Sequence, residues 1–374
     1  IYVYAVNSKK ANEIIRDSIE LEPYRDLLMV SKASRSNNLS QLKIKFEKIV
    51  EKIRNPKYFV RDVLIYIDVL RNDVVIYFGY NSTNDDKFMK AIRKYKPITE
   101  FTTPPKKRRS LMQFRHLNEE IVFKNRTNHY SANFKARDAR NVYLYPPGSK
   151  RNIQSRDINI KFFNGDVIFH SLNALTGRCT AGFRAINATG DYLVTAGHCF
   201  SQSVYGQRYY AAVQINGFSQ YFIGIAEYSQ LDPIEYGLIK TQFENIKHSP
   251  NIIHREFINP EDPESDVRVV KELYIAGNKG LQSHGAHLCK AGRVTETNCG
   301  EIIAFNGILT VSNDQITTNL IIAKSNIQNF VKHGDSGGPG FTYTIDLQWV
   351  SLDAITIGTK PYIGVFQPSD LILN

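Results

Sequence analysis

At 374 residues the chain is long for a single domain, and its charges are divided unevenly along it. Residues 1–161 carry 33 Lys and Arg against 17 Asp and Glu, whereas residues 162–374 carry 14 against 19. No apolar run approaches the length needed to cross a bilayer, which argues against a membrane protein and favours a soluble one. We therefore expect a basic part and an acidic part whose opposite charges satisfy each other.

The first hundred residues predict a small α+β unit. Apolar side chains from Leu42 to Ile53 recur mainly at spacings of three and four, which predicts an amphipathic helix that ends before Pro56. Residues 63–69 and 74–78 are rich in β-branched and aromatic side chains and predict a β-hairpin. A second helix is expected around residues 87–95.

Clusters of proline and basic residues at 102–109 and 145–151 then mark an exposed linker, which we place at residues 101–161. Exposed linkers are sites of processing, so we expect cleavage between Arg151 and Lys161. The basic run at 106–109 has a competing interpretation as a nuclear-localisation or nucleic-acid patch.

Residues 334–339 read Gly-Asp-Ser-Gly-Gly-Pro and carry the strongest chemical signal in the chain. A serine hydroxyl is a poor nucleophile at neutral pH, so it needs a base within hydrogen-bond reach and donors for the developing oxyanion. Small residues around Ser336 allow a tight turn in which the amides of Gly334 and Ser336 point at one place. The motif predicts a nucleophile with an oxyanion hole.

Residues 195–199 read Thr-Ala-Gly-His-Cys and supply a candidate base. A lone histidine beside apolar residues is more often a packed core residue than a catalyst. Upstream of the serine motif, however, His198 fits the general base that deprotonates Ser336. Short apolar runs spaced by turn residues place both motifs in an all-β region.

From residue 162 onward the chain resembles the bacterial branch of the chymotrypsin-like serine proteases, the alpha-lytic protease and streptogrisin group. The resemblance rests on residues 164–169 and 176–183, on the segment 285–293 that runs to Cys299, and on Phe366-Gln367-Pro368 near the end. It implies a protease domain at 162–374 made of two six-stranded antiparallel barrels, with the histidine in the first barrel and the serine in the second.

The third catalytic residue departs from that family's pattern. The usual aspartate precedes an aromatic residue, a glycine and two aliphatic residues, and here Glu235 occupies its place. A carboxylate one methylene longer can orient His198 if the backbone shifts. Asp232 is the competitor, and a site without a functional acid is the third possibility.

Four cysteines allow three pairings, and the resemblance implies Cys179 with Cys199 and Cys289 with Cys299. The family keeps the residue before the serine buried and ion-paired, which here implies a pair between Asp335 and Lys290. The disulfides, and glycosylation sequons at Asn38, Asn81, Asn125 and Asn187, suit an extracellular glycoprotein whose signal peptide has been removed.

The hairpin-then-helix order of residues 1–100 resembles the pro-region of the alpha-lytic group. We therefore predict a secreted, monomeric serine endopeptidase made as a zymogen, which acts on protein or peptide substrates without cofactor or metal. Its basic pro-region would lie on the acidic protease as inhibitor or folding aid, and neither nucleic acid nor membrane is an expected partner. The rivals are a catalytically silent binding protein and an esterase that uses the same triad. For the specificity pocket the resemblance points to the region of Asp353 and Ile355.

Overall fold

The computed structural model describes the following residues: 2–5, 7–32, 37–79, 85–102, 161–170, 178–200, 206–214, 218–243, 246–257, 268–311, 315–344, 347 and 349–373. The predicted cleavage segment before Lys161 and the sequons at Asn81 and Asn125 lie outside these residues. No helix in the described ranges is long and apolar enough to cross a membrane.

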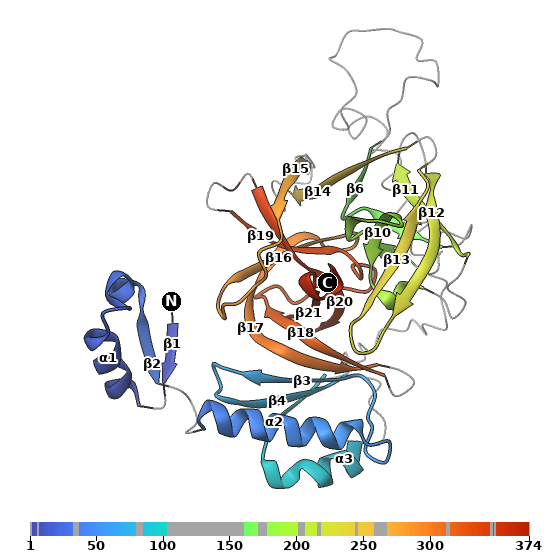
Figure 1. Ribbon diagram of the computed structural model, residues 1–374. Coiled ribbons are helices and arrows are strands. Elements are labelled where there is room, and N and C mark those ends of the chain that lie inside the picture. The colour runs from blue at the N-terminus through green and yellow to red at the C-terminus, as the bar shows by residue number, and fades with distance from the viewer. Residues whose placement is uncertain are drawn as a thin grey trace, which may run out of the picture.

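Residues 2–32 form a small parallel two-stranded sheet with one α-helix, at the left of Figure 1. Its elements are β1 (Tyr2–Ala5), α1 (Ser8–Asp17), the 3-10 helix η1 (Glu22–Leu27) and β2 (Met29–Lys32). Asn7 caps α1 by accepting a hydrogen bond from the amide of Lys10. No residue of α1 is buried, so this piece contributes little to the core.

Residues 39–101 form the α+β unit that the sequence predicts, and its helix, hairpin and second helix are confirmed. The elements are α2 (Leu39–Arg54), β3 (Val63–Asp68), β4 (Asp73–Phe78), α3 (Asp85–Ile92), η2 (Arg93–Tyr95) and β5 (Ile98–Phe101). Asn38 and Gln41 form a capping box at the start of α2. Helices α2 and α3 cover one face of the β3–β4 hairpin (Figure 1) and bury Ile49, Ile53 and Phe88 against it.

A seven-stranded sheet follows, in the order β8-β7-β11-β12-β13-β10-β9. Its strands are β7 (Val167–Phe169), β8 (Arg178–Thr180), β9 (Phe183–Asn187), β10 (Gly190–Thr195), β11 (Arg208–Gln214), β12 (Phe218–Gln230) and β13 (Tyr236–Thr241). The short helix η4 (Gly197–Cys199) leaves β10 and carries His198. Strands β10 and β13 are antiparallel neighbours, and this pairing sets Thr195 opposite Gly237.

The second sheet has twelve strands, three of which are β3, β4 and β5. The others are β6 (Lys161–Asn164), β14 (Lys247–Phe257), β15 (Arg268–Gly277), β16 (His287–Gly292), β17 (Glu296–Thr310), β18 (Ile316–Lys324), β19 (Pro339–Tyr343), β20 (Trp349–Lys360) and β21 (Ile363–Pro368). The chain ends in the short helix α5 (Asp370–Leu373). The predicted fold class, two β units preceded by a small α+β region, is confirmed, although the described sheets contain seven and twelve strands where six and six were expected.

The N-terminal unit joins the second sheet through main-chain pairing between β3 and β17. Ile65 lies opposite Ile308 and Leu64 opposite Leu309. The amide of Asp62 donates to the carbonyl of Thr310 at 3.0 Å, so the pairing continues past the end of the strands. The two parts of the chain are therefore held by a continuous sheet and by apolar packing around Ile308.

We expect Ile308→Ala to lower the free energy of unfolding by about 2–5 kcal/mol, because Ile308 is only 3% exposed and packs among side chains of the N-terminal unit. Urea denaturation measures the loss. The same substitution at Ile327, which is 51% exposed, should change stability by no more than about 0.5 kcal/mol. Equal losses in the two variants would contradict the packing described.

Candidate active site

The turn that carries Ser336 depends on glycine. Gly337 has φ of +87°, a region that side-chain-bearing residues rarely adopt. A β-carbon there would lie 1.9 Å from the Thr195 hydroxyl and 2.5 Å from the Thr180 carbonyl oxygen, both in the seven-stranded sheet. The turn can therefore approach the first sheet closely only because residue 337 lacks a side chain.

Asp335 anchors this turn from inside the protein. Its side chain and that of Lys290 are both fully buried, and Lys290 Nζ lies 3.2 Å from Asp335 Oδ2. The remaining donors to the carboxylate are the amides of Val294 (2.7 Å), Thr295 (3.1 Å) and Lys332 (3.0 Å) and the hydroxyl of Thr295 (2.5 Å). Burial lowers the pKa of Lys290, and the charge of Asp335 counters this. The ion pair implied by the resemblance is thus present.

The two amides predicted to form the oxyanion hole, those of Gly334 and Ser336, differ from their neighbours in this turn in their hydrogen bonding. The amide of Asp335 donates to the Lys332 carbonyl, and that of Gly337 donates to the Thr356 carbonyl. For the amides of Gly334 and Ser336 there is no acceptor among the described residues. Gly334 has φ of +101°, and its conformation sets the direction of the peptide groups that follow.

His198 and Glu235 are brought together by the pairing of β10 with β13. Glu235 directly precedes β13 and is 1% exposed, while the side chain of His198 is 41% exposed. Oε1 of Glu235 accepts a hydrogen bond from Nδ1 of His198, and the amide of His198 lies 3.4 Å from the same oxygen. The carboxylate of Glu235 is sealed from solvent, and the imidazole of His198 remains accessible.

Of the two candidate acids, Glu235 contacts His198 and Asp232 bonds elsewhere. Asp232 is exposed, and its Oδ2 accepts a hydrogen bond from the amide of Ile316 at 3.4 Å, away from His198. Glu235 is fixed from the other side by Gln367 on β21, whose Oε1 accepts from the Glu235 amide at 3.0 Å. Gln367 is fully buried, and its position holds the backbone where the longer side chain reaches the imidazole.

Glu235 also shifts the pKa of His198. Burial lowers the pKa of His198, but the negative charge of Glu235 and its hydrogen bond to the imidazole raise it, and the net shift is upward. Because Nδ1 faces Glu235, Nε2 lies on the opposite side of the ring, where it can exchange a proton with a neighbour.

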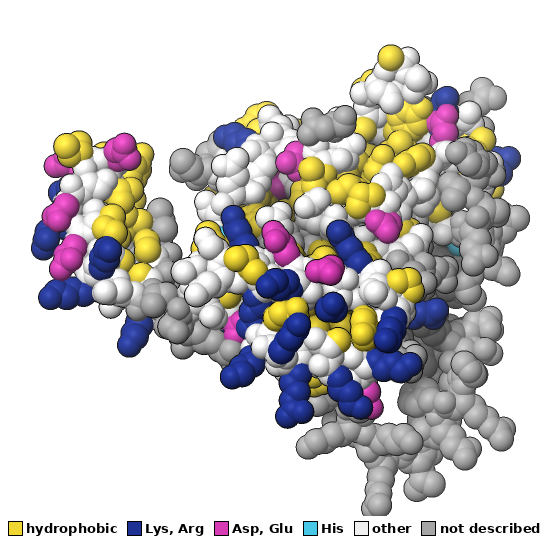
Figure 2. All heavy atoms as spheres, turned by 60° about the horizontal axis from the view of Figure 1, so that its bottom comes forward, with side chains coloured by type: hydrophobic (Ala, Val, Ile, Leu, Met, Phe, Trp, Pro, Cys, Tyr) yellow, Lys and Arg dark blue, Asp and Glu magenta, His cyan; other side chains and the backbone are white. Residues whose placement is uncertain are grey.

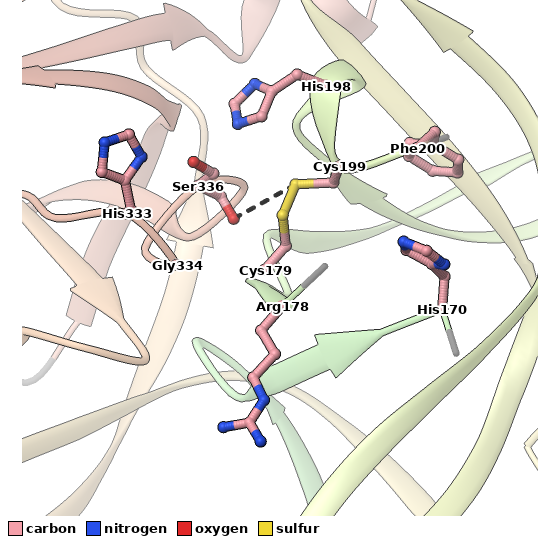
Figure 3. Close-up of a pocket in the computed structure, with 9 residues that line it drawn as sticks. All are labelled: His170, Arg178, Cys179, His198, Cys199, Phe200, His333, Gly334 and Ser336. Carbon is pink, nitrogen blue, oxygen red and sulfur yellow. Dashed lines mark hydrogen bonds between the residues drawn. A yellow bond between two sulfur atoms is a disulfide. The ribbon is translucent and has the colours of Figure 1, made fainter. Parts of the chain in front are cut away.

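His198 and Ser336 line a common cavity of about 390 Å³ (Figure 3). Its other lining residues are His170, Arg178, Cys179, Cys199, Phe200, His333 and Gly334. The Cys179–Cys199 disulfide lies between the two sides of this cavity, with Cys199 Sγ 3.8 Å from the carbonyl oxygen of Ser336. The candidate base, nucleophile and oxyanion-hole residue therefore face one space.

Both disulfides implied by the resemblance are formed, Cys179 to Cys199 and Cys289 to Cys299. The first ties β8 to η4 beside His198, and the second bridges β16 and β17 next to Lys290. Each bond thus stabilises a segment that holds one half of the site.

Several residues of the site carried no usable sequence signal. His170 and His333 lie far apart in the chain and in no motif, and Gln367 belongs to the tripeptide that supported the resemblance without a role being assigned to it.

Asp353, which was expected near the specificity pocket, does not line the cavity. Its carboxylate instead accepts hydrogen bonds from Thr342 and Ser351 at 2.7 Å each. The described residues contain no cluster of three or more His, Cys, Asp or Glu that could hold a metal.

No protein-family model matches the chain, and no curated protein sequence matches it. Several solved protein structures match the chain. Protease A of Thermobifida fusca is 20% identical, with a TM-score of 0.41 over 57% of this chain and 94% of its own. The Nocardiopsis protease is 20% identical, with a TM-score of 0.42 over 57% and 95%, and the alpha-lytic protease homolog N4 is 16% identical, with a TM-score of 0.40 over 57% and 95%. The likeness to these proteases is one of fold.

We expect Lys290→Met to destabilise the protein by about 3–5 kcal/mol, because Asp335 would remain buried without its cation. The double variant Lys290→Met/Asp335→Asn removes both charges and should lose less than the single variant. Urea denaturation of the two proteins provides the comparison. A double variant as unstable as the single one would show that the buried charge is not the cause.

Proposed function

We propose that this chain is a secreted serine endopeptidase, made as a pro-form, that cleaves peptide bonds through an acyl-enzyme on Ser336. The observation that carries the proposal is the bond between His198 Nδ1 and the buried carboxylate of Glu235, with Ser336 on the same cavity as the imidazole. A hydrogen-bonded acid, an accessible base and a nearby hydroxyl form the arrangement that activates serine.

In the proposed reaction His198 Nε2 takes the proton of Ser336 while Oγ attacks the carbonyl carbon of the peptide bond. The oxyanion that forms is held by the amides of Gly334 and Ser336. The imidazolium is stabilised by Glu235, which keeps its own charge throughout. His198 then gives its proton to the leaving amine as the carbon–nitrogen bond breaks, and water releases the acyl group by the same steps.

The pro-form proposal rests on the organisation of the chain. Residues 1–100 make up the proposed pro-region, residues 101–161 the linker and processing junction, and residues 162–374 the protease domain. Support comes from the β3–β17 pairing, which holds the N-terminal unit on the second sheet. A local α+β unit forms faster than a sheet built from distant strands, so it can template β17 during folding.

We expect the purified wild-type chain to lose its first 150 to 161 residues, and its Ser336→Ala variant to stay whole, because only the wild type has a nucleophile to cut the linker. Intact-mass spectrometry of both proteins is the measurement. If the variant is shortened at the same bond, cleavage does not depend on Ser336 and self-processing is wrong.

We expect the activity of the wild type to fall as the pH drops through a value above the ordinary histidine pKa of 6.5, since His198 must be neutral to accept the proton. Glu235→Gln removes the charge that raises this pKa, while burial still lowers it. The acidic limb of kcat/KM should therefore move to lower pH, and kcat should fall by up to about 10⁴-fold, the loss known for the equivalent change in other serine proteases.

The matched control for this experiment is Asp232→Asn, which removes a carboxylate three residues away. Because Asp232 is exposed and does not contact His198, its loss should leave both the acidic limb and kcat unchanged. A shift in this variant and none in Glu235→Gln would reverse the assignment of the acid.

A further inference from the structure

Two rows of lysine side chains lie on the helices that cover the N-terminal unit. Lys45, Lys48 and Lys52 follow the spacing i, i+3, i+7 along α2, and such residues share one side of a helix. Lys87, Lys90 and Lys94 repeat the same spacing along α3 and η2. Figure 2 shows basic side chains gathered over this face of the molecule.

The two rows lie next to each other, although Lys45 is part-buried and forms an ion pair with the buried carboxylate of Asp73. Lys45 Nζ donates to the carbonyl of Lys96 at 3.0 Å, which places the lysine side of α2 beside the end of η2. The opposite sides of the helices are occupied, because Ile49, Ile53 and Phe88 are buried against the hairpin. Lys48, Lys87, Lys90 and Lys94 are all exposed.

Few acidic groups offset this charge. Among the described residues, the exposed acids of α2 and α3 are Glu47, Glu51 and Asp86. The contact with the rest of the protein consists of main-chain pairing at β3, apolar packing on both faces of the hairpin and an ion pair between Asp62 and Lys360. Helices α2 and α3 lie below the hairpin in Figure 1, away from the other strands. We predicted that these charges attract the acidic protease domain. The exposed lysines of α2 and α3 face away from that domain and therefore do not serve this role.

A partner that matches two rows of regularly spaced cations is a polymer with repeating negative charge. The two disulfides indicate an oxidising compartment, where nucleic acid is not the usual polyanion. Insertion into a bilayer is disfavoured, since among the described residues of the two helices Leu39 and Ile44 alone are large apolar side chains that remain exposed. Sulfated or carboxylated polysaccharide is the class that fits.

We propose that the basic face, defined by Lys48, Lys52, Lys87, Lys90, Arg93 and Lys94, binds an extended anionic polysaccharide outside the cell. The choice of polysaccharide rests on the secreted location given above as part of the proposed function. Binding holds the chain at a polyanionic surface through its N-terminal unit.

The test uses heparin as the probe and the full-length Ser336→Ala chain, which keeps the N-terminal unit attached. With four ionic contacts, Kd should rise about a hundredfold between about 50 and 200 mM NaCl. A variant with Lys48, Lys87, Lys90 and Lys94 changed to Ala should bind at least about tenfold more weakly and depend less on salt. Changing the same four residues to Arg should restore binding.

The matched control replaces four exposed lysines of the protease domain, Lys247, Lys271, Lys279 and Lys324, by Ala. It makes the same change in net charge and should bind heparin like the parent chain. Equal loss in both sets would overturn the site, as would absence of heparin binding by the parent chain at about 50 mM NaCl. Tighter binding to duplex DNA or to phosphatidylserine vesicles than to heparin would overturn the class of partner.

This test is separate from that of catalysis, because binding is measured on a chain without the nucleophile. If the chain binds heparin but the wild type is inactive, the proposed protease function is wrong and the proposed binding site on the basic face still stands. An active wild type without heparin binding would remove only the present inference.

Discussion

The candidate site depends on the contact between the two sheets, because Ser336 lies beside the twelve-stranded sheet and His198 and Glu235 lie beside the seven-stranded one. Several close approaches fix this contact, and three of them lie next to the site. The amide of Thr180 donates to the carbonyl of Ser336 at 2.8 Å, Gly337 leaves room for Thr195, and Gln367 accepts from the amide of Glu235. Each contact connects the sheet beside Ser336 with the sheet beside His198 and Glu235. A shift of one sheet against the other would therefore change the distances among these three residues.

The glutamate at position 235 shows how this contact accommodates a change in the family pattern. Its side chain is longer than that of aspartate, yet Oε1 still meets Nδ1 of His198 because β13 and Gln367 hold the backbone on both sides. The carboxylate is nearly sealed from water, so its charge acts strongly on the imidazole. The altered acid is therefore compatible with a general base at His198.

Features that depend on residues close together in the chain could be predicted from the sequence. The spacing of apolar residues from Leu42 to Ile53 gave α2, and the motifs around His198 and Ser336 indicated which side chains would meet. The β3–β17 pairing could not be predicted, because any exposed strand edge can pair with another and the hairpin sequence does not specify a partner. The role of Gln367 was hidden for a similar reason, since a buried amide finds its partner only when distant strands come together.

Charge counting predicted attraction between the two parts of the chain but could not say where the charges lie. The structure places backbone pairing, apolar side chains and one ion pair, between Asp62 and Lys360, at the junction, and the exposed lysines of α2 and α3 on the opposite side. Net charge describes long-range attraction and solubility, whereas the position of each charge follows from which helix face is needed for the core. Here the apolar faces of α2 and α3 pack on the hairpin, so the lysines on their other faces point into solvent.

The measurement that tests the central claim most directly is labelling with a fluorophosphonate, followed by mass spectrometry of the modified peptide. An activated serine attacks the phosphorus and becomes covalently modified, whereas an ordinary hydroxyl does not. We predict a single label on Ser336 in the wild type and a strongly reduced label in His198→Ala. An unlabelled wild type, or equal labelling of the two proteins, would contradict the assignment of Ser336 and His198 as nucleophile and base.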